Sequence, residues 1–251
     1  MKNFENYSKY YDLFYRDKNY EKEVTYIVKL IERYANKKPH LILELGCGSG
    51  SHANFFSKQE FEIFGIERSP EMVKQAEEKK IKNFYPICAD IENFELENKQ
   101  FEVVTSLFHV ISYLTDNVKL LSTFHNVNKH LVHGGIFIFD VWYTPAVHNL
   151  KPKTAIKRIT SNKIKIIRIG ETVIQPNENI VNVNYEILVN DEGKNLNLSF
   201  NEIHPMRHFS IPEIDLLAKM TNFEIIHSEE FCTGNAPSEN TWGVCFLLKK
   251  I

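Results

Sequence analysis

Cysteine is scarce in this chain of 251 residues, and its four cysteines lie far apart. None of them has the close spacing of a zinc site, and nothing in their positions indicates a disulfide framework. Two fall in expected strands, so we expect reduced thiols and a cytoplasmic location. The four are Cys47, Cys88, Cys232 and Cys245.

The chain also lacks a strong excess of one charge and any long apolar run. Its formal net charge is -2 and its pI is near 6.6, so no global field favours nucleic acid or a membrane as a partner. No apolar run approaches the length of a membrane span, and the N-terminus has no apolar signal region. With 43% hydrophobic residues, the chain can still form a sizeable core.

The most informative stretch runs from Leu41 to His52. Its apolar part, residues 41–45, is typical of a strand buried on both faces of a parallel sheet. Glycines follow at the alternate positions 46, 48 and 50, and a helix is expected from residue 52 to residue 58. A strand, a glycine turn and a helix N-terminus together form a nucleotide-binding corner, although such turns also serve as plain tight connections.

Acidic residues at this corner indicate the kind of nucleotide. Glu44 ends the first strand, and Glu67 ends a second short strand about twenty residues on, where a ribose diol would lie. A carboxylate beside the turn repels a pyrophosphate and attracts a cation, and no phosphate-binding lysine motif is present. A positively charged nucleoside such as S-adenosylmethionine fits this pattern.

Three motifs carry a specific resemblance. The sequence from Glu44 to Gly50 resembles the first motif of the Rossmann-like (class I) S-adenosylmethionine-dependent methyltransferases, and 65–69 resembles the second. Residues 88–91 match the third, whose acid in that family faces the adenine amino group. The resemblance implies S-adenosylmethionine as cofactor, held by Tyr15, Arg16, Glu44, Gly46, Gly48, Gly50, Glu67, Arg68, Met72, Asp90, Ile91 and Leu107.

The fold expected from the pattern is α/β: a Rossmann-like, doubly wound, mostly parallel seven-stranded sheet. Strands are expected at 41–45, 64–67, 85–88, 101–107, 136–140, 223–231 and 242–249, with helices between most of them. Between about residues 154 and 207 the period changes to alternation, which predicts an antiparallel β insertion after the fifth strand. We expect residues 1–150 to form cap helices and the cofactor-binding core, 151–208 the insertion, and 209–251 the rest of the core. The insertion would roof the active site or form a homodimer surface.

The N-terminal segment is rich in aromatic residues, and a short amphipathic helix packing on the core is expected within residues 1–16. Residues 11–20 are similar to the opening of the methyltransferases that dimethylate the amino group of deoxyaminosugar nucleotides. In that branch the segment covers the cofactor and supplies a tyrosine near the acceptor, a position matched here by Tyr15. Residues 206–210 and 242–244 resemble the same branch.

The expected catalytic residues are Tyr15, His109 and Tyr113. The last two follow the fourth strand, and in doubly wound sheets the ligand lies at that edge. The aminosugar enzymes have a histidine where this chain has Tyr113, so His109 is interpreted either as the proton acceptor or as a loop residue packing on the cofactor. A neutral amine needs only the loss of a proton before it attacks, and no metal site is expected.

Trp142, Tyr143 and Arg207 are expected to bind the acceptor, with packing as the alternative for Trp142 and a solvated surface position for Arg207. His204, His125, His130 and His133 are expected to be structural or exposed. The leading hypothesis is methylation of a small polar acceptor, the amino group of a nucleotide-linked or phosphorylated sugar. The alternatives are O-methylation of a sugar or phosphoryl group in surface polysaccharide synthesis, and a cofactor-binding subunit without catalysis.

Overall fold

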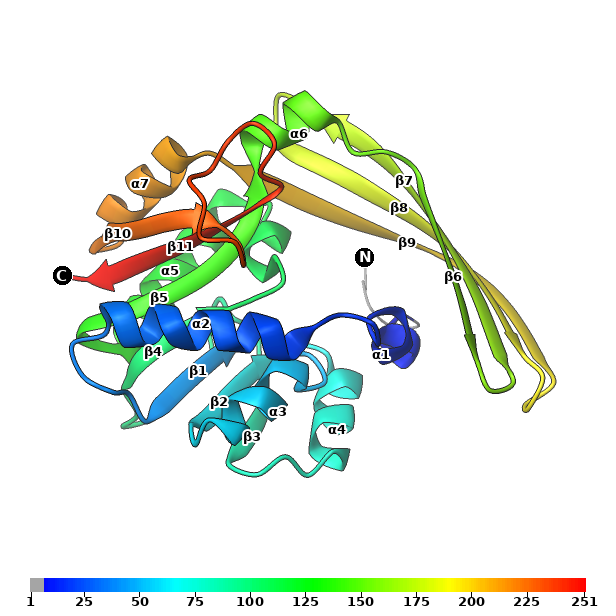
Figure 1. The fold of residues 1–251 in the computed structure, drawn as a ribbon, viewed down its shortest axis with the longest axis horizontal. Coiled ribbons are helices and arrows are strands. Elements are labelled where there is room, and N and C mark those ends of the chain that lie inside the picture. Colours follow the sequence, from blue (N-terminus) through cyan, green and yellow to red (C-terminus); the bar gives the residue numbers. More distant parts are fainter. Residues whose placement is uncertain (1–6) are drawn as a thin grey trace.

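The core of the protein is a seven-stranded sheet with strand order β3-β2-β1-β4-β5-β11-β10 (Figure 1). The computed structural model of the chain describes residues 7–251. Strands β1 to β5 are parallel, whereas β11 pairs antiparallel with both β5 and β10. The expected mostly parallel sheet is therefore confirmed. Its strands are β1 (Leu41–Leu45), β2 (Glu62–Glu67), β3 (Phe84–Cys88), β4 (Phe101–Ser106), β5 (Leu131–Tyr143), β10 (Phe223–Glu230) and β11 (Gly243–Lys250).

Helices cover both faces of this sheet. One hydrophobic cluster joins the sheet to α2 and α3, and a second joins its other face to α5 and α7. Side chains of Asn19, Ser69, Asp116 and Ser210 cap four of the helices, as the residue type predicts. The helices are η1 (Ser8–Tyr10), α1 (Tyr11–Phe14), α2 (Tyr20–Tyr34), α3 (Ser51–Lys58), α4 (Pro70–Glu78), η2 (Val110–Tyr113), α5 (Asn117–His130), α6 (Thr144–Leu150) and α7 (Ile211–Met220).

The insertion after β5 consists of long antiparallel strands that curve away from the core (Figure 1). They are β6 (Ala155–Ser161), β7 (Ile164–Gln175), β8 (Ile180–Asp191) and β9 (Leu196–Phe209). Within the alternating region the sequence pattern predicted strands at 164–169, 172–174, 180–189 and 196–204, so it missed β6 and α6 and placed a break near Gly170. Strand β7 runs through that glycine without a break. A Cβ there would lie 2.9 Å from the Tyr185 ring on β8, so packing and not a turn explains the glycine.

Strand β9 joins the insertion to the core. Its last residues pair in parallel with the end of β5, His208 opposite Trp142 and Phe209 opposite Tyr143. The sequence pattern predicted a helix over residues 120–131, stopped by Gly134–Gly135, and a strand only from residue 136. The helix α5 does end at His130, but β5 begins at once and runs through the two glycines. An irregularity in the pairing of β4 with β5 accommodates the extra residues.

The N-terminal segment packs against the insertion. Tyr7 and Phe14 are buried in a cluster with Ile159, Ile166 and Ile187 of the insertion, and α1 lies between the core and these strands (Figure 1). The helix expected within residues 1–16 therefore appears as the short pieces η1 and α1, with residues 1–6 outside the described part. Within residues 7–251, no helix combines the length and apolar character needed to cross a membrane.

Candidate functional site

The turn after β1 is shaped by glycines in the left-handed backbone region. Gly46 and Gly48 have φ values of +68° and +56°. A Cβ at Gly46 would lie 2.6 Å from Val110, whereas the nearest atom to a Cβ at Gly48 is the Met72 Cε at 3.4 Å. Gly46 is thus required by packing, while Gly48 presents bare backbone toward the adjoining cavity.

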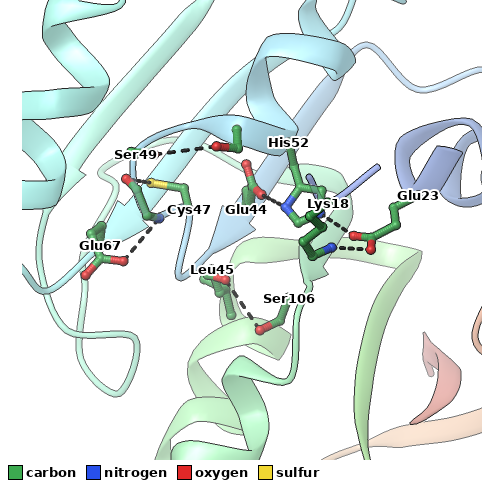
Figure 2. Close-up of polar contacts among 11 residues, drawn as sticks. Lys18, Glu23, Glu44, Leu45, Cys47, Ser49, His52, Glu67 and Ser106 are labelled. Atoms are coloured by element: carbon green, nitrogen blue, oxygen red, sulfur yellow. Dashed lines mark hydrogen bonds and ion pairs between the residues drawn. The ribbon is translucent and has the colours of Figure 1, made fainter. Parts of the chain in front are cut away.

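The carboxylate of Glu67, at the end of β2, bridges two turns. Its Oε2 accepts a hydrogen bond from Gly48 N at 3.1 Å and its Oε1 accepts one from Ser69 N at 2.8 Å. Burial raises the pKa of Glu67, and the two backbone hydrogen bonds partly oppose that rise. Figure 2 shows this carboxylate on one side of the glycine turn.

A chain of charged groups lies on the other side of the turn (Figure 2). His52 Nε2 lies 2.8 Å from Glu23 Oε2, and its Nδ1 lies 3.5 Å from Glu44 Oε1. Lys18 contacts the other oxygen of Glu23. Burial alone would lower the pKa of His52, but hydrogen bonds and charges from the two glutamates outweigh it and raise the pKa. Of these four residues, only Glu44 was expected from the sequence to belong to the site.

A cavity of about 260 Å³ opens from the glycine turn toward the N-terminal segment and the insertion. It lies at the carboxyl ends of β1, β2 and β4, where ligands of doubly wound sheets bind. Most of the residues expected to hold the cofactor line it: Tyr15, Gly46, Gly48, Glu67, Arg68, Met72, Asp90, Ile91 and Leu107.

His109 lines the same cavity and is paired with Asp140 at the end of β5. The backbone N–H of His109 donates to Asp140 Oδ2 at 3.2 Å, and the ring Nδ1 lies 2.7 Å from that oxygen. Burial would raise the pKa of Asp140, but the charge and hydrogen bonds of His109 lower it. The carboxylate is therefore ionised and fixes the orientation of the imidazole.

Tyr113 lines the cavity and contacts a histidine that was expected to be structural or exposed. Its Oη lies 2.9 Å from His204 Nδ1, and His204 Nε2 lies 3.1 Å from Glu202 Oε2. His204 is buried, yet it forms part of the cavity wall. This contact could not be predicted from local sequence patterns, because the two partners lie 91 positions apart.

Tyr15 reaches the cavity from the N-terminal segment. Its hydroxyl lies 3.0 Å from the Tyr7 hydroxyl and accepts a hydrogen bond from Arg168 Nη1 at 3.2 Å. Its ring packs edge-on against Phe108, with 4.9 Å between the ring centroids. A cation on the insertion therefore holds the tyrosine that the family resemblance pointed to.

Five residues of the expected site do not line the cavity. Arg16 donates instead to the Thr160 carbonyl on β6 at 3.0 Å. Arg207 donates to Asn117 Oδ1 and Glu213 Oε1, both at 2.7 Å, so its charge is compensated and it ties β9 to helices of the core. Glu44 is buried, Gly50 is the N-cap residue of α3, and Tyr143 packs against the core. Trp142 does line the cavity.

The residues present fit S-adenosylmethionine. Glu67 and Asp90 line the cavity at the ends of neighbouring strands, which suits a ribose and an adenine amino group. The buried Oε2 of Glu44 has no hydrogen-bond partner among the described residues, and negative charge there favours a cationic ligand. No group of three or more side chains able to hold a metal ion occurs within residues 7–251.

The raised pKa of His52 predicts a pH-dependent contribution to stability. That contribution is complete below the ordinary pKa of 6.5 and is lost as the pH rises through the higher folded-state value. His52→Gln removes it, so the difference in unfolding free energy between wild type and variant should shrink from pH 6 to pH 9. Urea denaturation at each pH measures this difference. A difference that is constant or grows with pH would contradict the assigned pairing.

Comparison with known proteins identifies the domain around this corner. Residues 42–135 match the family described as "Methyltransferase domain". The chain is 26% identical over 207 residues to the dTDP-3-amino-3,4,6-trideoxy-α-D-glucopyranose N,N-dimethyltransferase of Streptomyces venezuelae, covering 82% of this chain and 84% of that one.

Two solved structures share the whole fold, insertion included. An S-adenosylmethionine-dependent methyltransferase from Clostridium acetobutylicum superposes with a TM-score of 0.81 at 22% identity, over 96% of each chain. A sugar N-methyltransferase from a Streptoalloteichus species superposes with a TM-score of 0.80 at 21% identity, over 96% of this chain and 92% of that one.

The glycine turn, the two acids beside it, the sheet order and the family match all lead to one assignment. Residues 42–135 therefore form a methyltransferase domain, and the chain as a whole is similar in sequence and fold to S-adenosylmethionine-dependent methyltransferases, the aminosugar-nucleotide N,N-dimethyltransferases among them.

Proposed function

We propose that the protein methylates the amino group of a nucleotide-linked or phosphorylated sugar. The observation that carries this proposal is the cavity itself, which runs from the glycine turn to a wall formed by Tyr15, His109 and Tyr113. Residues of the glycine turn and residues of the proposed acceptor wall thus line one cavity, in which a cofactor and an acceptor would meet. A dimethyltransferase of a dTDP-aminosugar is among the relatives of this chain.

The cofactor supplies a methyl group on a sulfonium, which is a good leaving group for an in-line displacement. The chain's own work is to align the acceptor and to exclude water. We propose that Glu67 binds the ribose hydroxyls and that Asp90 faces the adenine. The N-terminal segment closes the site on the side of the insertion, where Arg168 holds Tyr15.

A second groove next to the cavity supports an acceptor that carries phosphate. Trp142 and Tyr185 line both the cavity and this groove. Its cations are Lys151, Lys153, Lys157 and Arg168, and none of its lining residues within the described chain is acidic. Although the whole chain is close to neutral, this surface attracts a phosphorylated ligand.

Two histidines at the cavity support nitrogen as the methylated atom. His109 is held by Asp140, and His204 contacts both Tyr113 and Glu202. Each arrangement can receive the proton that an ammonium must lose before its lone pair can attack. Trp142 is proposed to pack against the acceptor from the end of β5.

We further propose a homodimer through the insertion and a cytoplasmic location. The insertion exposes large apolar side chains, which supports a self-association surface. The cysteines at 47, 88, 232 and 245 are all unpaired, as in a reducing compartment. The exposed side chains are Ile156, Val173, Leu188, Leu196 and Ile203.

The experiment that tests the function is a screen of acceptors by mass spectrometry. The protein is incubated with S-adenosylmethionine and dTDP-linked amino sugars, each matched by the same sugar without its nucleotide and by the hydroxyl analogue. We expect a gain of one or two methyl groups on the amino sugar nucleotide only. Methylation confined to the hydroxyl analogues would replace the proposal with O-methylation.

Replacing Glu67 by alanine should weaken cofactor binding. The variant loses a carboxylate that is positioned to accept hydrogen bonds, so the binding free energy for S-adenosylmethionine should fall by about 1–3 kcal/mol. Calorimetry measures the change. Glu71→Ala, an exposed carboxylate at the start of α4, is the matched control and should bind normally. Equal affinity of both variants would remove Glu67 from the cofactor site.

Reversing the charge of Lys151 and Lys153 together should raise the KM for a phosphorylated acceptor. Two exposed ion pairs at ~0.5–1 kcal/mol each correspond to a change of roughly five- to thirtyfold, which shrinks as salt is added. The dissociation constant for S-adenosylmethionine should not change. Lys163→Glu in the distant turn between β6 and β7 is the control. An unchanged KM would show that the groove does not take the acceptor.

A further inference from the structure

Three titratable side chains form a hydrogen-bonded row behind the acceptor end of the cavity. Tyr113, from η2, lies against His204, and His204 lies against Glu202, both on β9. The side chains of His204 and Glu202 are only 3% and 8% exposed. The row therefore starts at the cavity wall and ends inside the protein.

The surroundings hold this row in place from several elements. The ring centroids of Tyr7 and Tyr185 lie 5.1 Å and 5.0 Å from that of His204. Tyr7 N donates to Glu202 Oε1 at 3.1 Å, so this carboxylate is hydrogen-bonded at both oxygens. Two cations also lie near the row: Arg168 lies over the Tyr185 ring at 4.7 Å, and the charge of Arg68 acts on Tyr113.

The order of the hydrogen-bond partners determines which of these groups can donate a proton and which can accept one. A neutral His204 that donates its Nε2 proton to Glu202 has a lone pair on Nδ1, and that lone pair faces the Tyr113 hydroxyl. Burial is the main cause that raises the pKa of Tyr113 well above its ordinary value. The phenol is therefore neutral at physiological pH and can pass a proton on, but it does not remain as a phenolate.

Methylation of an amine requires a group that removes protons from the acceptor nitrogen. Each attack requires the acceptor nitrogen to be free of its extra proton, and each transfer leaves the product positively charged. A second methyl group can be added only after a further proton has left. Once the bound cofactor and acceptor have displaced water from the cavity, a side chain must receive these protons.

We propose that His204 receives the acceptor's proton through the hydroxyl of Tyr113, with Glu202 stabilising the imidazolium that forms. An N–H bond of the acceptor ammonium breaks and its proton binds to the Tyr113 oxygen. The original hydroxyl proton of Tyr113 moves to His204 Nδ1, and the amine keeps its electron pair. Tyr113 is the catalytic residue, whereas His204 and Glu202 are positioning residues that act through it. This inference rests on the proposed function.

His109 and Asp140 offer a competing route at the end of other strands. The two routes share no residue, so variants can separate them. Tyr113→Phe removes a single oxygen, which makes it the least disruptive change in the row. His204→Gln and His109→Gln remove one imidazole each and provide a matched pair.

The first test needs no acceptor. Protein with ¹⁵N-labelled histidines is bound to S-adenosylhomocysteine, and the imidazole nitrogen shifts are recorded from pH 6 to pH 9, with His204→Gln assigning the signals. We expect the ¹⁵N shifts to show a proton on Nε2 of His204 and none on its Nδ1. In Tyr113→Phe the Nδ1 signal should shift, because the hydrogen bond to the tyrosine hydroxyl is lost. A His204 that stays doubly protonated throughout this range has no lone pair and would overturn the proposal. This result is independent of whether a sugar amine is the acceptor.

The second test uses the pH profile of kcat on the acceptor found in the screen. At pH 7 the kcat of Tyr113→Phe and that of His204→Gln should each be roughly 10²-fold below the wild-type kcat. Both values should recover as the pH approaches the pKa of the acceptor amine. The double variant should lose no more than either single variant, because both act on one route. A purely structural defect would not recover at high pH. The same pH-dependent loss in His109→Gln, with His204→Gln unchanged in profile, would assign the proton to His109.

Discussion

The site depends on one carboxylate that joins two turns. Glu67 accepts backbone hydrogen bonds from Gly48 and Ser69, so the loops after β1 and β2 are held at a fixed separation. The glycine turn can then keep its left-handed backbone and present Gly48 to the cavity, where a side chain would intrude. The remaining walls, including Asp90 and His109, lie at the ends of strands that pair in register with β1 and β2.

The core sheet and its nucleotide corner could be predicted from the sequence because local patterns encode them. Buried parallel strands appear as short apolar runs, and the turn at Gly46 and Gly48 has a spacing that few other structures require. The insertion was recognised by its alternating pattern. Strand β6 was missed because Lys157 and Arg158 interrupt its apolar residues, and β7 was split at Gly170 because the packing of Tyr185 cannot be read locally.

The contacts on the proposed acceptor side could not be predicted, because they join residues far apart in the chain. Tyr113 meets His204 across 91 positions, and Tyr15 meets Arg168 across 153. Both contacts depend on how the insertion folds back, which the pairing of β9 with the end of β5 determines. Arg207 illustrates the converse: its charge suggested an acceptor site, but Glu213 on α7 compensates it. The sequence thus indicates the glycine turn and its acids, while the contacts around Tyr15 and Tyr113 follow only from the folded insertion.

The acids beside the glycine turn should make this corner bind a positively charged nucleoside and not a nucleotide phosphate. Thermal unfolding in the presence of S-adenosylmethionine, and separately of ATP, tests it most directly. A ligand that binds only the folded state stabilises it by about 2.7 kcal/mol at one hundred times its Kd. We expect a concentration-dependent rise in Tm with S-adenosylmethionine and none with ATP. A rise with ATP and none with S-adenosylmethionine would contradict it.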